Sequence, residues 1–203
     1  MDKKNKIISL TSFIIFVIIM ILVVFKLTKP FDECIYNILS SIQTKNVDNF
    51  FKIVTTLGNP STILIVLLVA MLLLTKKEKI FLLINSINCV LTNTVIKNII
   101  RRKRPTVIHL IKQGGYSFPS GHAMISITVY GFFMILVVNK IQNKYLKYFL
   151  VTILSLIIIL IGLSRIYVGV HFASDILAGY MLALSELIFM NNLLKKQIGG
   201  KNV

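Results

Sequence analysis

Long apolar runs constrain this chain more than any other feature of its sequence. A helix that crosses a bilayer needs roughly 20 predominantly apolar residues. Six segments approach this length, at about residues 7–27, 61–75, 80–100, 123–138, 148–163 and 172–194. The chain is 56% hydrophobic and only 15% charged, which is too apolar for a water-soluble domain of 203 residues. The sequence therefore predicts an all-α, polytopic membrane protein with six transmembrane helices in one bundle.

Two of these runs, at 61–75 and 123–138, are short for a membrane span. We expect them to gain length from their flanks, because polar residues are tolerated inside a helix bundle. The first run follows three lysines, as a signal-peptide core does, but it is longer than a typical core and no small-residue cleavage site follows. The sequence predicts that this run is retained, within a single domain at residues 1–203.

Lysines indicate which side of the membrane each loop occupies. In a six-span layout four lysine-rich segments share one side: the amino terminus, 76–79, 140–147 and 195–201. Because cytoplasmic loops carry an excess of Lys and Arg, we expect both termini in the cytoplasm and the protein in the plasma membrane. Residues 26–59 then lie outside, with a short interfacial helix at about 35–53. The basic run 101–104 also falls outside, which indicates another role for its cations.

The net charge of +16 does not indicate a nucleic-acid partner, because the lysines flank apolar runs in short clusters. We therefore expect no nucleic-acid binding. Cys34 falls in a loop and Cys89 in the middle of an apolar run, so the two cysteines should lie at different depths. We expect no disulfide between them, and neither spacing resembles a metal site.

Three short clusters with phosphate-binding chemistry stand beside the apolar runs. In the first, Lys97 and Arg104 are seven residues apart, so both side chains project from one face at the outer end of the third span. Pro105 then ends the helix. An ordinary basic flank, with its stem in the lipid and its charge in water, explains Lys97 alone better than catalysis does.

The second cluster is the turn Pro119-Ser120-Gly121-His122, which precedes an apolar helix. The backbone N–H groups of Ser120, Gly121 and His122 can point at an anion near the positive end of that helix. A plain N-cap, with Ser120 capping the fourth span, is the alternative.

The third cluster combines Arg165 with His171 and Asp175. A carboxylate four residues after a histidine on a helix can accept a hydrogen bond from the ring, which fixes the tautomer and leaves the other nitrogen free to attack. Arg165 can fork onto two phosphate oxygens. A His–Asp pair that only caps a helix is the alternative reading of this cluster.

In order and in every spacing, the three clusters resemble the signature of the type 2 phosphatidic acid phosphatase superfamily. The motifs lie within residues 97–175, and the six-helix layout extends the resemblance over nearly the whole chain. The resemblance implies a membrane phosphatase that uses no metal and no other cofactor. The composition agrees, since of seven acidic residues only Asp175 lies in the clusters, whereas a Mg-dependent phosphatase should show more.

The resemblance also implies roles for individual residues. We expect His171 to be the nucleophile that forms a phosphohistidine, with Asp175 as its orienting partner. We expect His122 to be the general acid that protonates the leaving group. The residues expected to bind the phosphoryl oxygens are Lys97, Arg104, Ser120, Gly121 and Arg165.

The position of the clusters at helix ends near the outer boundary favours an amphiphilic substrate. Its phosphate would rest at headgroup depth while its tail stays in the lipid. Within the family, the bacterial candidates are undecaprenyl diphosphate, phosphatidylglycerol phosphate and phosphatidic acid. Arg101, Arg102 and Lys103 are expected to attract anionic headgroups or a second phosphate.

Two other functional classes remain open. One is a non-catalytic membrane protein that binds anionic lipid through the basic loop, and the other is a vanadate-dependent haloperoxidase, whose relatives are soluble bundles unlike this apolar chain. The sequence leaves four features unassigned or open: the monophosphate or diphosphate preference, the oligomeric state, and the roles of His109 and Glu186. A polar stripe on the third span is read as inter-helix hydrogen bonding, and consists of Asn85, Asn88 and Thr92.

Overall fold

The computed structural model describes residues 3–199, which contain eight α-helices and no strand. In chain order the helices are α1 (Lys3–Val24), α2 (Lys29–Ser40), α3 (Lys45–Thr56), α4 (Pro60–Leu73), α5 (Lys76–Ile100), α6 (Gly121–Lys140), α7 (Lys144–Tyr167) and α8 (Ala173–Gly199). The all-α membrane fold that the apolar runs predict is confirmed.

Five of these helices, α1, α5, α6, α7 and α8, are long and apolar enough to cross a membrane. The run at 61–75, where the sequence predicts the second span, forms only the short helix α4. Helix α3 precedes it at an angle of 48°, and the two together can make a sixth, broken span. The break falls at Asn59-Pro60, where proline takes the first position of α4 because its ring cannot continue the preceding helix.

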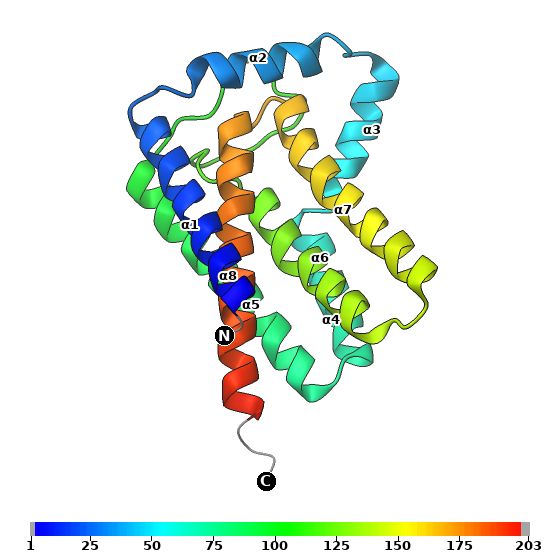
Figure 1. Ribbon diagram of the computed structural model, residues 1–203. Helices are drawn as coiled ribbons and strands as arrows, with labels where there is room; N and C mark the ends of the chain where they lie inside the picture. The colour runs from blue at the N-terminus through cyan, green and yellow to red at the C-terminus, as the bar shows by residue number, and fades with distance from the viewer. Residues whose placement is uncertain (1–2, 200–203) are drawn as a thin grey trace.

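The interfacial helix predicted at 35–53 is not continuous. Residues 41–44 interrupt it, and Thr44 then caps α3 by accepting a hydrogen bond from Val47 N. Only α2 lies across the end of the bundle, whereas α3 turns down along α7 and leads into α4 (Figure 1). The predicted boundaries were wrong because α2 ends at Ser40 and the Thr44 side chain begins a separate helix inside the segment that was expected to be continuous.

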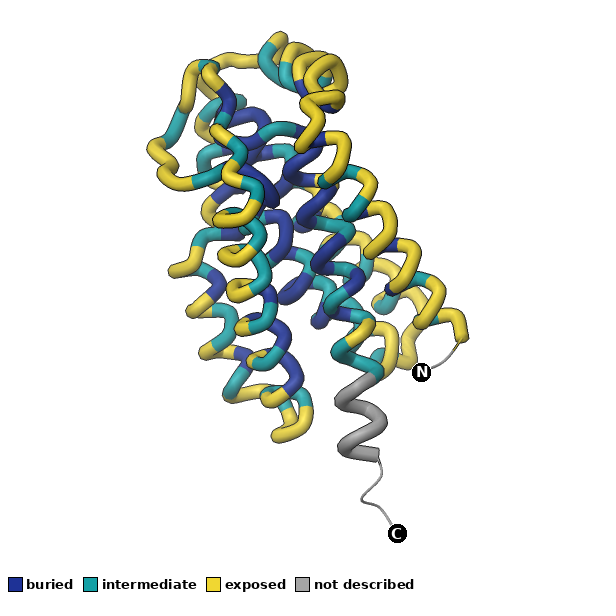
Figure 2. Tube along the Cα trace, turned by 90° about the vertical axis from the view of Figure 1, so that its left-hand side faces the viewer, coloured by how far each residue is buried: buried dark blue, intermediate teal, exposed yellow. Residues whose placement is uncertain are grey.

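Helix α8 occupies the centre of the bundle and packs against α1, α5 and α6 (Figure 1). Ser9 on α1 and Ser185 on α8 each donate a hydroxyl hydrogen bond to the other's carbonyl, at 3.0 and 2.9 Å. Buried residues line the inward faces of the helices and exposed ones face outward (Figure 2). The outward faces are strongly apolar, with Leu72 and Leu73 83% and 79% exposed, as a lipid-facing surface requires.

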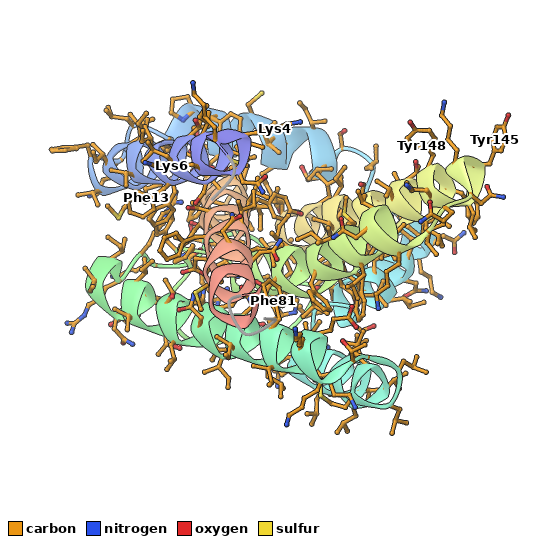
Figure 3. All side chains as sticks on the ribbon, turned by 60° about the horizontal axis from the view of Figure 1, so that its bottom comes forward. Lys4, Lys6, Phe13, Phe81, Tyr145 and Tyr148 are labelled. Atoms are coloured by element: carbon orange, nitrogen blue, oxygen red, sulfur yellow. The ribbon has the colours of Figure 1, made fainter. Side chains whose placement is uncertain are left out.

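The start of α1 and the later part of α8 lie at the same end of the bundle, away from α2 (Figure 1). Viewed toward that end, Lys4 and Lys6 mark the start of α1, and Tyr145 and Tyr148 at the start of α7 point away from the bundle (Figure 3). Exposed tyrosines and lysines are typical of residues at the boundary between lipid and water. This end is referred to below as the terminal end.

Candidate active site

The structure brings the three sequence clusters together at the end of the bundle opposite the terminal end. The last turns of α5 and α7 meet the first turns of α6 and α8 there, and the loop 101–120 joins them. A cavity of about 620 Å³ opens between these segments. The predicted site residues that line it are Lys97, Arg104, Gly121, His122, Arg165 and His171. Ser120 and Asp175 do not line the cavity, and each is fully buried.

His171 and Asp175 form a buried pair at the start of α8. Asp175 Oδ2 lies 3.3 Å from His171 Nδ1, and it also accepts hydrogen bonds from Phe172 N at 2.9 Å and from the Ser117 hydroxyl. On the other side of the ring, Nε2 lies 3.2 Å from Arg104 Nη1. A guanidinium can only donate, so Nε2 carries the lone pair and Nδ1 carries the proton. The nitrogen that faces the cavity is therefore the unprotonated one.

Burial is the main influence on the charge of His171. It lowers the pKa of the ring to about 4, against the opposing effect of Asp175, and Arg165 and Arg104 lower it further. The free imidazole is consequently neutral at neutral pH. A neutral ring held by a carboxylate on one nitrogen is the form that a histidine nucleophile needs.

Arg104 holds the wall of the cavity together. Its guanidinium donates to the carbonyls of Gly114, Gly115, Tyr116 and Val170 at 2.7–3.3 Å. Burial lowers its pKa, and Asp175 opposes that effect. Because a guanidinium stays protonated at neutral pH, Arg104 places a fixed positive charge beside His171 Nε2.

Lys97 and Arg165 add two further cations to the cavity. Lys97 Nζ donates to Tyr116 O at 2.7 Å. Arg165 Nη1 donates to Thr55 Oγ1 at 2.6 Å and Nη2 to Gln113 Oε1 at 2.8 Å, but its buried Nε has no partner among the described residues. An unpaired buried donor is costly unless something accepts from it, and an anion in the cavity satisfies that need.

In the turn at 119–122, one residue caps α6 and the next two present backbone N–H groups to the cavity. Ser120 N donates to Asp175 O at 3.1 Å, and Ser120 Oγ accepts from Ala123 N, so this residue caps α6 as the alternative reading of the sequence had it. Gly121 N and His122 N belong to the first turn of α6, which has no preceding carbonyls to bond them. These two N–H groups supply the positive end of α6 to the cavity.

His122 enters the cavity from α6. Its Nε2 lies 2.9 Å from Asn59 Oδ1, in the segment between α3 and α4. Because the amide oxygen accepts, Nε2 carries a proton in this arrangement. The ring also rests against Gly58, where a Cβ would come within 2.7 Å of His122 Cδ2. The α3–α4 break therefore positions His122.

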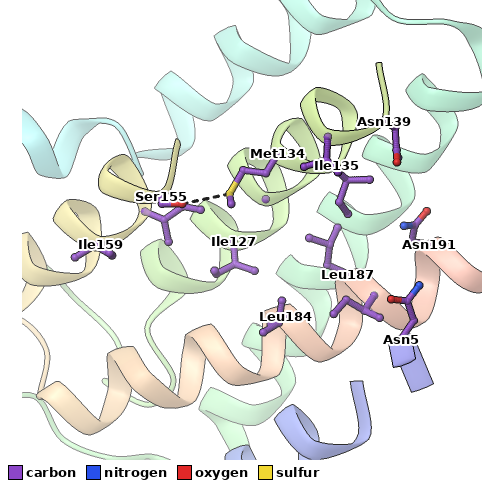
Figure 4. Close-up of a pocket in the computed structure, with 14 residues that line it drawn as sticks. Asn5, Ile127, Met134, Ile135, Asn139, Ser155, Ile159, Leu184, Leu187 and Asn191 are labelled. Atoms are coloured by element: carbon purple, nitrogen blue, oxygen red, sulfur yellow. Dashed lines mark hydrogen bonds between the residues drawn. The ribbon is translucent and has the colours of Figure 1, made fainter. Parts of the chain in front are cut away.

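A second cavity of about 540 Å³ differs from the first in its chemistry (Figure 4). It lies toward the terminal end, where Asn5 comes from the start of α1, Asn139 from the end of α6 and Asn191 from the later part of α8 (Figure 4). The rest of its described lining is almost entirely apolar, and none of the described lining residues is acidic, basic or a histidine. Among these residues are none of the groups that phosphate chemistry requires.

A protein-family model matches the part of the chain that contains all three clusters. A model of the PAP2 superfamily matches residues 78–198. The chain belongs to the PAP2 superfamily. This is the type 2 phosphatidic acid phosphatase superfamily, so the family that the three motifs resemble is confirmed.

Individual PAP2 proteins show how far the likeness extends. Phosphatidylglycerophosphatase B of Bacillus subtilis (strain 168) is 36% identical over 98 residues, which make up 46% of this chain and 47% of that protein. The matched part thus spans about half the length of this curated relative.

Two solved structures share the fold. The "first transmembrane PAP2 type phosphatidylglycerolphosphate phosphatase from Bacillus subtilis" aligns with a TM-score of 0.84 and 27% identity, over 93% of this chain and 96% of that one. Aquifex aeolicus LpxE aligns with a TM-score of 0.64 and 23% identity, over 77% of this chain and 92% of that one. The second similarity supports the fold alone. The first also supports a multi-pass membrane protein.

Several residues of this PAP2 chain hold the site in place although the sequence motifs did not single them out. They are Asp32, Thr55, Asn59, Asn93, Arg102, Gln113 and Ser117. Asn93 donates to Pro119 O at 3.0 Å and thereby ties α5 to the turn before α6. Ser117 stands just before the motif turn, but nothing in its spacing indicates that it donates to Asp175.

The structure gives Arg102 different partners from those that the sequence predicts. The sequence predicts that Arg101, Arg102 and Lys103 attract anionic headgroups or a second phosphate. The Arg102 guanidinium instead pairs with two buried carboxylates, Asp32 and Asp175, inside the protein. The expectation was wrong because the acidic partner Asp32 lies far away in the sequence, on α2.

The structure also shows the surroundings of the two cysteines and of the two residues whose roles the sequence leaves open. Cys34 is exposed, Cys89 is buried, and both are free. His109 Nε2 lies 2.8 Å from Pro105 O, so it braces the loop before α6. Glu186 is on α8, with one buried carboxyl oxygen that has no partner among the described side chains.

Proposed function

We propose that this protein is a membrane lipid phosphatase that hydrolyses a phosphate monoester or diphosphate without a metal. The observation that supports this most strongly is the cavity itself, whose two ends have opposite chemistry. One end holds two histidines and three cations. The other end is apolar and is lined by residues of α4, α5 and α6, namely Ile63, Leu64, Leu67, Val90 and Ile125.

The apolar end favours a lipid over a soluble phosphate. Leu64 and Val90 line the cavity and are also 57% and 58% exposed on the outside of the bundle. The cavity wall is therefore continuous with the lipid-facing surface between α4 and α5. A substrate whose phosphate sits among the cations can extend its chain through this wall into the bilayer, whereas a sugar phosphate would leave the apolar wall facing water.

The first chemical step transfers the phosphoryl group to the protein. His171 Nε2 donates its electron pair to phosphorus, the bond from phosphorus to the lipid oxygen breaks, and that oxygen takes a proton from His122. Asp175 stabilises the positive charge that develops on the His171 ring. Lys97, Arg104, Arg165 and the N–H groups at the start of α6 bind the phosphoryl oxygens, where negative charge develops.

The second step releases phosphate and restores the site. Water gives a proton to His122 and attacks phosphorus, the bond between phosphorus and Nε2 breaks, and its electron pair returns to His171. For a monoester the sum is lipid phosphate plus water giving lipid alcohol plus inorganic phosphate. For a diphosphate the leaving oxygen belongs to the inner phosphate, and the sum is lipid diphosphate plus water giving lipid monophosphate plus inorganic phosphate. No group in this scheme requires a metal or a cofactor, in keeping with the prediction from the sequence. Ser120 contributes by shaping the turn rather than by touching phosphate.

The substrate class follows from the relatives and the cavity together. The Bacillus subtilis relative is named for phosphatidylglycerol phosphate, and this lipid is one candidate here. Undecaprenyl diphosphate and phosphatidic acid are the others, because each also joins an anionic phosphoryl group to an apolar chain. We place the site at the outer face of the plasma membrane and both termini in the cytoplasm, on the strength of the lysine distribution.

Phosphate release by detergent-purified protein tests the proposal. The assay contains EDTA and a panel of polyprenyl diphosphates and glycerolipid phosphates, and the relative rates identify the preferred substrate. We expect His171→Ala to lower kcat at least about a thousandfold, because no nucleophile remains. His109→Gln is the matched control. It removes a histidine of the loop before α6 that does not line the cavity, and it should retain activity.

The main alternative is a protein that binds anionic lipid without catalysis. It predicts vesicle binding that survives the loss of both His122 and His171, with no phosphate release by the wild type. Full activity in His171→Ala, or activity only without EDTA, would contradict the phosphohistidine route. Bromide oxidation by peroxide in the presence of vanadate would instead indicate a haloperoxidase.

A further inference from the structure

A chain of buried ion pairs connects the His171–Asp175 pair to helix α2. Arg102 Nη1 donates to Asp175 Oδ1 at 2.6 Å, and Arg102 Nη2 donates to Asp32 Oδ2 at 2.7 Å. The side chains of the two carboxylates are 0% and 1% exposed. One guanidinium thus bridges two buried carboxylates, using a separate nitrogen for each.

Neighbouring groups immobilise this bridge. The Arg102 guanidinium lies 4.0 Å above the centre of the Phe172 ring and donates to Ser174 Oγ at 2.8 Å. Asp32 accepts from both the backbone N and the hydroxyl of Ser174, each at 2.8 Å. The carbonyl of Arg102 accepts from Ser117 N at 2.8 Å. Arg102 therefore has a single arrangement available, fixed by α2, by α8 and by the loop before α6.

We propose that Arg102 and Asp32 are positioning residues for the His171 nucleophile, an inference that rests on the proposed phosphatase function. Asp175 uses Oδ2 for His171, Ser117 and Phe172, and only Oδ1 is free to hold the carboxylate against rotation. Arg102 holds Oδ1, and Asp32 holds Arg102. The orientation of the His171 ring consequently depends on α2, a helix that contributes nothing to the cavity lining.

The alternative is that the bridge only stabilises the fold. Buried ion pairs are weak evidence for stability, because desolvation of both charges offsets much of their attraction. A contact that only stabilises the fold and a contact that positions His171 also differ in which measured quantity changes when they are lost. Loss of a stabilising contact lowers the melting temperature and leaves the folded protein's kcat and pH profile alone, whereas loss of a positioning contact changes both in folded protein.

The variants Asp32→Asn, Arg102→Lys and Arg102→Met test the proposal. We expect kcat to fall about 10- to 100-fold, as is usual when the outer partner of an oriented histidine is lost. KM and inhibition by inorganic phosphate should stay within twofold, because the cavity cations are untouched. Arg102→Lys should recover only part of the activity, since one ammonium cannot reproduce the fork. Glu33→Gln, which removes the neighbouring exposed acid on α2, is the control and should match the wild type.

The double variant tests whether Asp32 and Arg102 act through the same contact. If both act through Asp175, the double variant Asp32→Asn with Arg102→Met should be no slower than Arg102→Met alone. Multiplied effects would show that the two residues act independently and would overturn the proposal. So would a kcat that stays at the wild-type level in folded Asp32→Asn and Arg102→Met.

The pH profile supplies a second readout. Removal of the Arg102 charge makes proton uptake by the His171–Asp175 pair easier, so the acid limb of kcat/KM should move to higher pH in Arg102→Met. The other charged or titratable groups that face the pair are Lys97, Arg104, His122 and Arg165, with Asp32 behind Arg102. All of them are retained in this variant. An unchanged acid limb would contradict the proposal.

A chemical probe separates this inference from the proposed function. Diethylpyrocarbonate acylates neutral imidazoles, and peptide mass spectrometry reports the rate at His171 by itself. We expect Asp32→Asn and Arg102→Met to slow acylation of His171 severalfold relative to His109 in the same molecule, whether or not the wild type releases phosphate. An inactive wild type would end the phosphatase proposal, while equal acylation rates in folded variants would end the positioning proposal.

Discussion

At the scale of single residues, the two ring nitrogens of His171 have different partners, and this difference determines which one can react. Nδ1 faces Asp175 at 3.3 Å and Nε2 faces Arg104 Nη1 at 3.2 Å. A cation on the reactive side suits an anionic substrate, because a phosphoryl oxygen can take the guanidinium contact as phosphorus approaches Nε2. Under the proposed mechanism, the ring is therefore held in the orientation for attack before substrate arrives.

The pH dependence of activity should reflect the burial of His171. Its pKa is about 4 rather than the ordinary 6.5. Below that pKa Nε2 is protonated and cannot attack, and above it the ring is neutral, so kcat/KM should fall only as pH drops toward 4. The measurement is kcat/KM between pH 3.5 and 7, with the substrate's own ionisation followed by ³¹P NMR in the same micelles. An acid limb near 6.5 that is independent of the substrate would contradict this assignment.

Sequence spacing predicts the residues of this site better than it predicts their partners. Helical periodicity does not join the pairs that it suggested, because α5 ends at Ile100 and leaves Arg104 in the following loop, while His171 lies just before α8 begins at Ala173. The prediction that Lys97 and Arg104 share a helix face up to Pro105 was wrong, since Arg101 adopts a left-handed conformation that ends α5 earlier. Arg102 has its partner Asp32 on another helix, and only the packed fold brings the two together. Ser120 shows the same limit, since its spacing allowed both capping and phosphate binding and the fold uses it as a cap.

At the scale of elements, the site depends on how closely α8 approaches the start of α6. Gly179 on α8 lies so near that a Cβ there would come within 2.9 Å of the Ser120 carbonyl oxygen and 3.1 Å of Ala123 Cβ. A glycine allows this approach because it has no side chain. The contact brings the start of α8, which carries the His171–Asp175 pair, next to the start of α6, which carries His122.

Gly179→Ala should therefore separate the two helices. We expect a loss of about 1–3 kcal/mol in unfolding free energy from overpacking, and a kcat that falls at least about tenfold because the two histidines move apart. Gly131→Ala is the matched control at the same interface, where the added Cβ meets the tip of the Leu187 side chain at 3.1 Å and Ile127 Cγ2 at an ordinary contact distance of 3.9 Å. Thermal unfolding and phosphate release measure both effects. A kcat that stays at the wild-type level in folded Gly179→Ala would show that the site tolerates movement of α8.

Apolar length predicts the helices of this protein well where one run corresponds to one span. It locates α1, α5, α6, α7 and α8, although the ends differ by several residues. It fails between residues 45 and 73, because the broken pair α3–α4 joins a polar helix to an apolar one. That break contributes to the site, since Asn59, its last residue before α4, bonds to His122.

At the scale of the whole molecule, the two ends of the bundle differ in chemistry. The end covered by α2 carries the histidines, the cations and the buried carboxylates, whereas the described part of the terminal end carries an apolar cavity rimmed by amides. Under the proposed function, a molecule with this polarity acts on one leaflet only. The orientation of the molecule in the membrane therefore decides which pool of lipid it can reach.

The two native cysteines provide a direct test of that orientation. Cys34 is exposed on α2, beside the proposed active site, and Cys89 is buried within α5. If α2 faces outward, a charged, membrane-impermeant maleimide should label intact cells at Cys34, and Cys34→Ser should abolish the label. Lys144→Cys in the Cys34→Ser background is the matched control, because it places a thiol at the exposed start of α7, at the opposite end. It should react only after permeabilisation. The reverse pattern would place the histidines at the cytoplasmic face and exclude an outer-leaflet substrate.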